Sequence, residues 1–360
     1  MELSSEMASR NLRPLQSAPE PQTVVASIVT WNHAHCIQAC LESLLEQTML
    51  PMEIIVYDNA STDLTCEVLL YFGKQIKVIR SNVNLGFCGG HNEVINSTKS
   101  DFVLLVNPDV ILAKDYIATA VSRMGDAPRI GTVCGLLLQA KPGTPGCLID
   151  GAGLNMSRSR HPVLRYHGSE AAQVVAKPDE VFGVDGALPL FRRQMIDEIK
   201  IDGYFFDPLF FAHKEDHDVA WRSQIYGWHS VFEPNCNAIH PRNFKPGNLG
   251  LRRKLRPEIK YHAVKNDLLL LLKNEDGANF LKDCFQIVFR QLAILGYILM
   301  FERTSLRAYS FTLKNLPRIL QHRRTIRRNR KASPSQIRRQ FFLNWRPQVE
   351  MGGQQRTRVS

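Results

Sequence analysis

Apolar segments of strand type alternate with helical patterns through the first third of the chain. Residues 35–48 carry apolar side chains at helical spacing, residues 61–63 (Ser-Thr-Asp) resemble a helix N-cap, and the glycine-rich residues 84–92 open a third helix. Four further segments are predicted strands: 23–31 and 53–58, which have the composition of buried strands, and 77–81 and 101–106. This alternation predicts an α/β fold, with a mostly parallel sheet and helices on both faces.

Beyond residue 125 the pattern is less regular. Strands are predicted at 132–139 and in 230–243, and residues 205–228 form a loop that feeds a helix. The stretch 141–180 is rich in Gly, Pro and polar residues, which predicts an insertion with short strands. After residue 250 the chain becomes helical and basic. We therefore expect four segments: a disordered lead-in at 1–22, an α/β domain at 23–250, a helical region at 251–322 and a flexible basic tail at 323–360.

Polar side chains follow each of the four early strands. Because ligands bind beyond the carboxyl ends of parallel strands, this edge of the sheet is the predicted site. The side chains are Thr30 and Asn32, Asp58 and Asn59, Asn82 and Asn84, and Asn107 and Asp109.

The turn Asn107-Pro108-Asp109 ends the fourth strand, because proline lacks the N–H that a central strand needs. One interpretation is an Asx-type turn that closes the strand. The other is that Asp109 coordinates a hard cation that bridges phosphate oxygens, since Mg²⁺ is commonly held by one or two carboxylates plus substrate phosphates. The glycines of residues 86–92 permit either close ligand approach or close packing, and they match neither a P-loop nor a dinucleotide fingerprint.

Residues 214–218 (Lys-Glu-Asp-His-Asp) form the densest acidic cluster of the chain. Such carboxylates can simply favour the positive end of a helix dipole. Aromatic residues surround the cluster, however, and a carboxylate in an aromatic pocket has a raised pKa and can act as a general base. His240, which precedes Pro241, is either a surface histidine or a metal ligand.

Composition narrows the class of protein. With 360 residues and 44% hydrophobic content, the chain can bury a sizeable core. The eight cysteines are scattered without a C-x-x-C pair, which favours reduced thiols over a disulfide framework or a zinc site. The N-terminus has no apolar stretch of signal-peptide type, and the apolar runs 268–272 and 292–301 are each too short to span a bilayer. These features predict a cytoplasmic protein without a transmembrane segment.

The positive charge is concentrated at one end. Residues 301–360 hold 15 Lys and Arg against two acidic residues, whereas the first 300 residues are slightly acidic. The apolar residues 280–301 and this basic end are either a helical cap with a solvated tail or an amphipathic platform on an anionic membrane surface. The run 323–331 is also a possible polyanion site, although it lacks the interleaved aromatics typical of nucleic-acid binding.

Taken in order, the motifs resemble the inverting glycosyltransferases of family 2, which have the GT-A fold. The resemblance covers roughly residues 24–245 and rests on IVTWN, VYDNASTD, NVNLGFCGGHN, LLVNPDV, GALPLFRR and FDPLFFAHKEDHDVAWR. The NLGF-x-GG-x-N stretch, with NPD in place of D-x-D, is most similar to the rhamnosyltransferases that build O-antigen and other bacterial surface polysaccharides. The resemblance implies a GT-A domain with a Rossmann-like sheet, followed by a C-terminal helical extension.

The same resemblance assigns roles to single residues. Asp216, with Glu215 beside it, corresponds to the catalytic pair whose Asp deprotonates the acceptor. Asp109 corresponds to the metal and diphosphate ligand, with Mg²⁺ or Mn²⁺ as the cofactor, and His240 to a late metal ligand of some members. Asn107 stands where relatives carry a further carboxylate. The residues implied in nucleotide-sugar binding are Thr30, Asn32, Asp58, Asn59, Asn84 and Gly86, together with Asn107 and Asp109.

The implied reaction is hexosyl transfer, with L-rhamnose from dTDP-L-rhamnose as the best match. The partners would be a nucleotide-sugar donor, a saccharide or polyprenyl-linked saccharide acceptor, and an anionic membrane surface on the inner face of the cytoplasmic membrane. A family-2 transferase that uses a UDP- or GDP-sugar is an alternative.

Other classes of protein are also considered: a nucleotide-sugar-binding protein without catalysis and a nucleic-acid-binding protein. A nucleotidyltransferase would need a glycine-rich loop followed by a basic residue, which TWNHAHC at 30–36 does not offer.

Overall fold

The computed structural model describes residues 22–174, 176–241 and 249–342. The predicted disordered lead-in, apart from residue 22, and the last part of the predicted basic tail lie outside these residues. The four early strands form as expected and pair in parallel: β1 (Val24–Thr30), β2 (Glu53–Asp58), β3 (Lys77–Arg80) and β4 (Phe102–Val106).

The sheet runs in the order β10-β12-β6-β11-β4-β1-β2-β3. The strand β11 (Leu190–Arg192) lies antiparallel between β4 and β6 (Ile130–Leu138), and β12 (His229–Ile239) runs parallel to β6. Three short strands pair antiparallel at the margins: β10 (Asp179–Val181) and β5 (Ile111–Leu112) with β12, and β7 (Ile149–Gly151) with β6. The predicted α/β fold with a mostly parallel sheet is confirmed.

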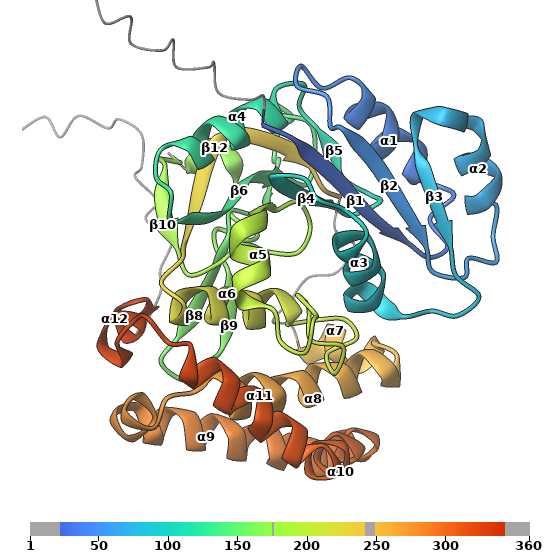
Figure 1. The fold of residues 1–360 in the computed structure, drawn as a ribbon. Coiled ribbons are helices and arrows are strands. Elements are labelled where there is room, and N and C mark those ends of the chain that lie inside the picture. Colours follow the sequence, from blue (N-terminus) through green and yellow to red (C-terminus); the bar gives the residue numbers. More distant parts are fainter. Residues whose placement is uncertain (1–21, 175, 242–248, 343–360) are drawn as a thin grey trace, which may run out of the picture.

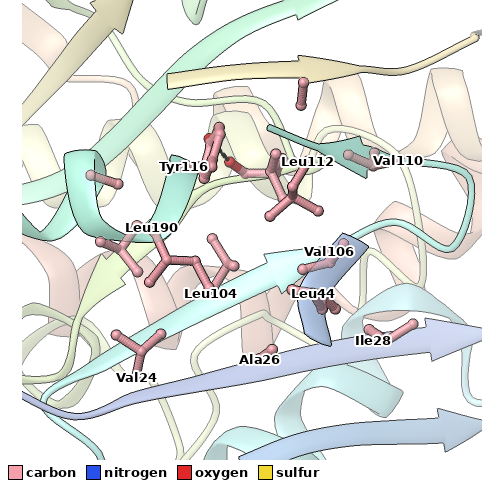
Figure 2. Packing of buried hydrophobic residues seen from close by; sticks show 14 of the residues in the cluster. Val24, Ala26, Ile28, Leu44, Leu104, Val106, Val110, Leu112, Tyr116 and Leu190 are labelled. Carbon is pink, nitrogen blue, oxygen red and sulfur yellow. Dashed lines mark hydrogen bonds between the residues drawn. The ribbon is translucent and has the colours of Figure 1, made fainter. Parts of the chain in front are cut away.

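Helices cover both faces of the sheet (Figure 1). The helices α1 (Ile37–Leu45), α2 (Thr65–Tyr71) and α4 (Tyr116–Gly125) share one core with Val24, Ala26 and Ile28 of β1 (Figure 2). Val25 of the same strand points to the opposite face, where it packs with Val94 of α3 (Gly86–Asn96). The helices α5 (Arg193–Ile199) and α6 (Glu215–Ile225) contribute to the large core on that second face. The alternation of β1 thus separates two layers of helices.

The predicted insertion forms a small second sheet. Its strands β8 (Leu154–Ser157) and β9 (Pro162–Leu164) form a hairpin, and β13 (Phe341–Phe342) from the far end of the chain pairs with β8. Short 3₁₀ turns lie at Gly73–Gln75, Ala171–Gln173 and Arg303–Leu306.

The C-terminal helices lie beneath α6, on the side away from the sheet (Figure 1). They are α7 (Leu249–Lys254), α8 (Pro257–Asn274), α9 (Gly277–Phe301), α10 (Arg307–Lys314), α11 (Leu316–Arg328) and α12 (Pro334–Arg339). The expectation of a flexible tail from residue 323 needs correction, because residues 323–342 continue α11 and form α12 and β13. Their order has a physical cause: Ile326, Ile337 and Phe341 are buried in the core shared with α6.

A second correction concerns helix length. The helix α9 has 25 residues, and an 18-residue stretch of it has a mean hydropathy of 1.7, so that by length and composition alone it could cross a membrane; it is the one such helix in the described ranges. The sequence-based estimate was too short because it counted an apolar run that Arg290 and Gln291 interrupt, whereas the helix continues through both.

A buried ion network joins the C-terminal helices to α6. The Lys273 ammonium on α8 lies 2.7 Å from Asp207 and 2.9 Å from Asp218, and all three side chains are about 1% exposed. Asp218 also pairs with Arg222, and Asp207 with His322 on α11. Because a buried charge without its partner is costly, this network fixes α8 and α11 against α6.

Candidate active site

The Asn107-Pro108-Asp109 turn lies where β4 ends. The Asn107 carbonyl accepts a hydrogen bond from the N–H of Val110, and the Asn107 N–H donates to the Ala187 carbonyl at 2.8 Å. Pro108 is buried, while the Asp109 side chain is 33% exposed. The turn therefore closes the strand and also presents a carboxylate beyond the carboxyl end of the sheet.

His240 lies against this carboxylate. Its Nε2 is 3.3 Å from Asp109 Oδ1, and its Nδ1 is 2.7 Å from Asp150 Oδ2. Burial alone would lower the pKa of His240, but the hydrogen bonds to Asp109 and Asp150 outweigh it and raise the pKa to about 9. Burial alone would likewise raise the pKa of Asp109, and His240 holds that pKa below its usual value. The structure thus brings together two residues that lie 131 positions apart in the sequence.

The donor set fits a divalent cation of the type that phosphate esters carry. Asp109 and the Nε2 of His240 are neighbours at 3.3 Å, and Asp150 binds the ring through Nδ1, as carboxylates do for metal-bound histidines. The described residues hold no cluster of three or more His, Cys, Asp or Glu side chains arranged for a metal. Two protein ligands are sufficient where phosphate oxygens and water complete the coordination.

The segment after β1 lies beside Asp109. The Nδ1 of His33 is 3.3 Å from the buried Thr30 Oγ1 and accepts the Trp31 N–H at 3.1 Å. Burial lowers the pKa of His33, and the negative charge of Asp109 opposes that shift. The Trp31 ring between these residues is 41% exposed. This end of β1 therefore brings the imidazole of His33 within electrostatic reach of Asp109, and exposes an aromatic side chain two positions before it.

Asn32 and Asp58 shape the loop that follows β2. Asn32 has a φ of 60°, and its side-chain oxygen accepts the Thr62 N–H at 2.8 Å and the Asp63 N–H at 3.3 Å. The buried Asp58 accepts the Ser61 N–H at 3.3 Å. These bonds hold the ends of β1 and β2 together at the predicted edge.

Asn59 and Asn84 hold the start of α3. The amide of Asn59 donates to the Gly86 carbonyl at 3.0 Å and accepts the Leu85 N–H at 2.8 Å, while Asn84 accepts the Gly86 N–H. Gly86 has a φ of 72°, and a Cβ there would lie 2.5 Å from the Phe211 carbonyl oxygen. Close packing against residue 211 thus accounts for glycine at this position, and a donor-binding role for these three residues stays a prediction.

Glu215 and Asp216 open α6 after a strained segment. Phe211, His213 and Lys214 all have positive φ values, between 63° and 72°. Non-glycine residues rarely adopt this conformation, and such strain persists only where the surroundings enforce it.

The two adjacent carboxyls differ in their surroundings. Burial, followed by the charge of Asp216, raises the pKa of Glu215 to about 8. Burial would also raise the pKa of Asp216, but His217 outweighs it, with the Nδ1 and the backbone N–H of His217 both 2.7 Å from Asp216 Oδ1. At neutral pH Asp216 is thus ionised and Glu215 carries a proton, so Asp216 is the available base.

The segment 185–187 connects the two carboxylate sites. Ala187 accepts the N–H of Asn107, and the neighbouring Gly186 donates its N–H to the Asp216 carboxylate. A Cβ on Gly186 would lie 3.2 Å from the Phe87 ring and 3.7 Å from Glu215 Oε1. The Asp109 turn and Asp216 therefore both contact one three-residue segment.

The helix α8 holds the strained loop from below. The side-chain amide of Asn266 donates to the carbonyls of Phe210, Ala212 and His213 at 3.1, 2.8 and 2.5 Å. Lys265 donates to the Leu209 carbonyl at 2.5 Å. These side chains stabilise the positive-φ segment, and with it the position of Asp216.

Lys214 anchors the same segment at its end. Its ammonium is 2.5 Å from Asp267 Oδ1, and Asp267 also binds Arg290 of α9 at 2.7 Å. Asp267 thus joins α8, α9 and the residue that precedes Glu215.

Sequence reasoning missed Asp150, His33 and Asn266. Asp150 lies in the irregular insertion and Asn266 in a helix expected only to cap the domain, so neither had a local signal. The imidazole of His33 in TWNHAHC, two residues after the strand, was a signal that could have been used.

The sheet order, the antiparallel β11 and the insertion before it define the class of this protein, an α/β protein with the GT-A fold of nucleotide-sugar transferases. The mannosyltransferase PcManGT of Pyrobaculum calidifontis, solved with GDP-Man and Mn²⁺, superposes with a TM-score of 0.52 at 16% identity over 84% of this chain and 79% of that one. GalNAc-T7, solved with UDP, GalNAc and Mn²⁺, gives a TM-score of 0.57 at 15% identity over 85% of this chain and 58% of that one.

Residues 26–200 match the family described as glycosyl transferase family 2. Residues 26–200 thus form a glycosyl transferase family 2 domain, which confirms the resemblance drawn from the motifs. It is an inverting glycosyltransferase with a nucleotide-sugar donor and a saccharide acceptor.

Two bacterial enzymes are similar to this chain in sequence. N-acetylglucosaminyl-diphospho-decaprenol L-rhamnosyltransferase of Mycobacterium tuberculosis is 24% identical over 240 residues, which cover 61% of this chain and 76% of that protein. Poly-β-1,6-N-acetyl-D-glucosamine synthase of Staphylococcus epidermidis is 20% identical over 283 residues, which cover 75% of this chain and 61% of that protein.

Proposed function

We propose that this chain transfers L-rhamnose from dTDP-L-rhamnose to a lipid-linked saccharide during cell-surface polysaccharide synthesis. The observation that carries the proposal is that residues 185–187 contact both Asp216 and the turn that bears Asp109, the partner of His240. Displacement of a nucleoside diphosphate with inversion needs a base on the acceptor side and charge stabilisation on the leaving-group side. The likeness to the mycobacterial rhamnosyltransferase supports the choice of sugar and of a prenyl-linked acceptor.

In the proposed reaction, Asp216 accepts the proton of an acceptor hydroxyl while that oxygen bonds to the anomeric carbon of the donor. The bond from this carbon to the diphosphate breaks on the opposite side, so the configuration inverts. His217 and Gly186 hold the carboxylate in place. Asp109 and His240 would hold Mg²⁺ or Mn²⁺, which when bound neutralises the charge of the leaving diphosphate.

Replacement of the base separates an enzyme from a binding protein. Asp216→Asn should reduce transfer by at least about 100-fold, because a positioned base contributes 10²–10⁴-fold, while donor binding is retained. Donor binding is measured by thermal shift and transfer by release of the nucleoside diphosphate. Asp197→Asn, an exposed carboxylate on α5, is the matched control and should leave both unchanged. Full transfer activity in Asp216→Asn would remove this residue from the mechanism.

The donor is tested separately, by a thermal-shift panel of nucleotide sugars with and without Mn²⁺. Greater stabilisation by dTDP-L-rhamnose than by UDP- and GDP-sugars supports the proposal. A clear preference for a UDP- or GDP-sugar would replace rhamnose with another donor and leave the transferase assignment intact.

The structure offers little support for nucleic-acid binding through residues 323–331. Arg323 donates to the Leu272 carbonyl, Arg330 pairs with Asp276, and Lys331 pairs with Glu198. Several charges of this run therefore hold α11 and the segment after it against the rest of the protein.

A further inference from the structure

The helix α9 has its polarity reversed relative to an ordinary surface helix. Asp283 and Arg290 point into the protein, where Asp283 pairs with Arg160 at 3.1 Å and with Arg338 at 2.6 Å, and Arg290 pairs with Asp267. Many of its large apolar residues are exposed. A helix at the surface of a globular protein normally buries its apolar side.

The outward residues form one continuous strip. The first four members lie three or four positions apart and the last two follow after a further seven and eight, which places them on one side of the helix over roughly 30 Å. The most exposed are Phe285 at 85%, Phe289 at 76%, Leu281 at 74% and Met300 at 72%. Leu292 and Leu299 complete the strip, which we call the α9 face, and α9 lies at the outer side of the helical layer (Figure 1). Contiguous apolar surface of this extent marks an interaction site.

The α9 face continues into a crevice between α8, α9 and α10. The crevice has a volume of about 220 Å³, and Leu292 lines it together with residues that are apolar except for Gln291: Leu268, Leu271, Leu272, Leu295 and Tyr309. Apolar surface is therefore available both on the exposed α9 face and inside the crevice.

Positive charge surrounds this surface. Among residues 252–342 the six acidic residues are each within ion-pair distance of an arginine: Glu258, Asp267, Glu275, Asp276, Asp283 and Glu302. Lys282 lies on α9 itself and is exposed, Arg303 follows its end, and the Arg253 guanidinium lies 5.5 Å from the Phe301 ring. The partner of the α9 face should thus be apolar inside and anionic at its surface.

We propose that the α9 face docks the protein on an anionic phospholipid bilayer, with the helix lying in the plane of the interface. A bilayer surface offers both required properties, because anionic headgroups cover an apolar interior. A spanning orientation would have to break the ion pairs of Asp283 and Arg290 and leave their charges in hydrocarbon. A second copy of the chain would bring like charges together around the same face, which opposes association. The proposal concerns location and holds whichever sugar is transferred.

Flotation with lipid vesicles tests the proposal without donor or acceptor. Vesicles of phosphatidylcholine plus phosphatidylglycerol should carry the full chain to the top of a density gradient, whereas phosphatidylcholine alone should carry it at least about tenfold less. The double variant Phe285→Ser, Phe289→Ser should lose at least about tenfold in binding. The matched control is Leu70→Ser, Tyr71→Ser on α2, where both side chains are also highly exposed but lie far from α9, and it should bind like the wild type.

Charge is tested in the same assay. Lys282→Glu with Arg303→Glu should weaken binding to the anionic vesicles, and Lys74→Glu with Lys77→Glu should not.

Equal vesicle binding of the wild type and the Phe285, Phe289 variant would overturn the proposal. So would a wild-type dimer that this variant converts to a monomer and that does not bind vesicles, since the occupant would then be a second copy. Retained donor-induced thermal stabilisation verifies that each variant is folded.

Discussion

Glu215 and Asp216 are neighbours in the chain, but they hold protons differently. Asp216 interacts with His217 and Gly186, whereas Glu215 is buried and its Oε2 has no hydrogen-bond partner among the described residues. A carboxyl in that position is more stable in its neutral form. The pair thus combines one ionised and one protonated group at neutral pH.

This difference predicts how stability depends on pH. The pKa of Glu215 is about 8 in the folded protein against 4.5 when unfolded, so between these values the folded state holds a proton that the unfolded state lacks. Stability therefore falls as pH rises from about 5 to 8. Glu215→Gln removes this linkage, and its free energy of unfolding, measured with urea, should fall less over that range than that of the wild type.

Asp197→Asn is the control for this comparison and should follow the wild-type pH dependence. His240, whose pKa is also raised, lowers stability with rising pH in the same way in every variant. Parallel curves for the wild type and Glu215→Gln would show that Glu215 is ionised when folded.

Asp150 supports the proposed cation site without facing the cation. It binds the Nδ1 of His240 at 2.7 Å, so Asp150→Asn should leave the ring present but less well oriented. We expect Mn²⁺ affinity to fall about 10- to 100-fold, measured by titration in the presence of donor, with metal-free donor binding unchanged. Asp179→Asn, an exposed carboxylate of the same insertion, should have no effect. Equal loss in both variants would contradict the assignment.

Single residues were predictable from sequence where the chain places them at strand ends. Asp109 follows β4 and Asp216 lies in the first turn of α6, so each could be placed at the end of a predicted element. Asp150 was not predictable, because its contact with His240 spans 90 residues and depends on the path of the insertion. The two possible reasons for a glycine at 86 were likewise separated only by the approach of Phe211.

At the scale of elements, the helix α8 controls the loop before α6. Asn266 alone binds three carbonyls of that loop and is fully buried. Asn266→Ala leaves these carbonyls without that donor, so the segment that positions Asp216 should relax. We expect kcat to fall at least about tenfold with the Kd of the donor unchanged, because small displacements of a catalytic group are costly.

Asn315→Ala is the control within the same helical layer, since Asn315 donates only to a carbonyl four residues earlier. It should alter neither constant. A change in donor affinity in Asn266→Ala, equal to its change in kcat, would indicate general loosening of the fold.

Elements were predicted well where hydrophobic patterns are local. The four early strands and the helices between them appeared at the expected residues, because β1, β2 and β4 are buried and therefore continuous apolar runs, and the largely exposed β3 still carries the β-branched pair Val78 and Ile79. The antiparallel β11 and the pairing of β13 with β8 could not be predicted, since they depend on contacts between distant segments. The order of residues 323–342 was missed for the same reason: the basic composition of this stretch conceals a few buried apolar side chains.

At the scale of the whole molecule, the C-terminal helices and the α/β domain are one unit. Lys273 is the centre of the network that joins them, and its partners are as buried as it is. Lys273→Met should lower the free energy of unfolding by about 3–5 kcal/mol, because Asp207 and Asp218 lose a buried partner. Denaturant unfolding monitored by tryptophan fluorescence provides the measurement.

Lys200→Met is the comparison, since Lys200 pairs with the half-exposed Asp197. Its effect should be about 1 kcal/mol or less. Similar losses in the two variants would show that the network contributes no more than a surface ion pair.

Asp267 has a consequence for how the outside of the protein and its chemistry are linked. One carboxylate holds Arg290 of the outward helix and Lys214, the residue directly before the catalytic pair. Both ion pairs are short, and the side chains that form them are largely shielded from water. We therefore expect a displacement of α9 to be transmitted to the start of α6. Binding of another body to the outer surface of α9 should accordingly affect the geometry of proton transfer at the catalytic pair.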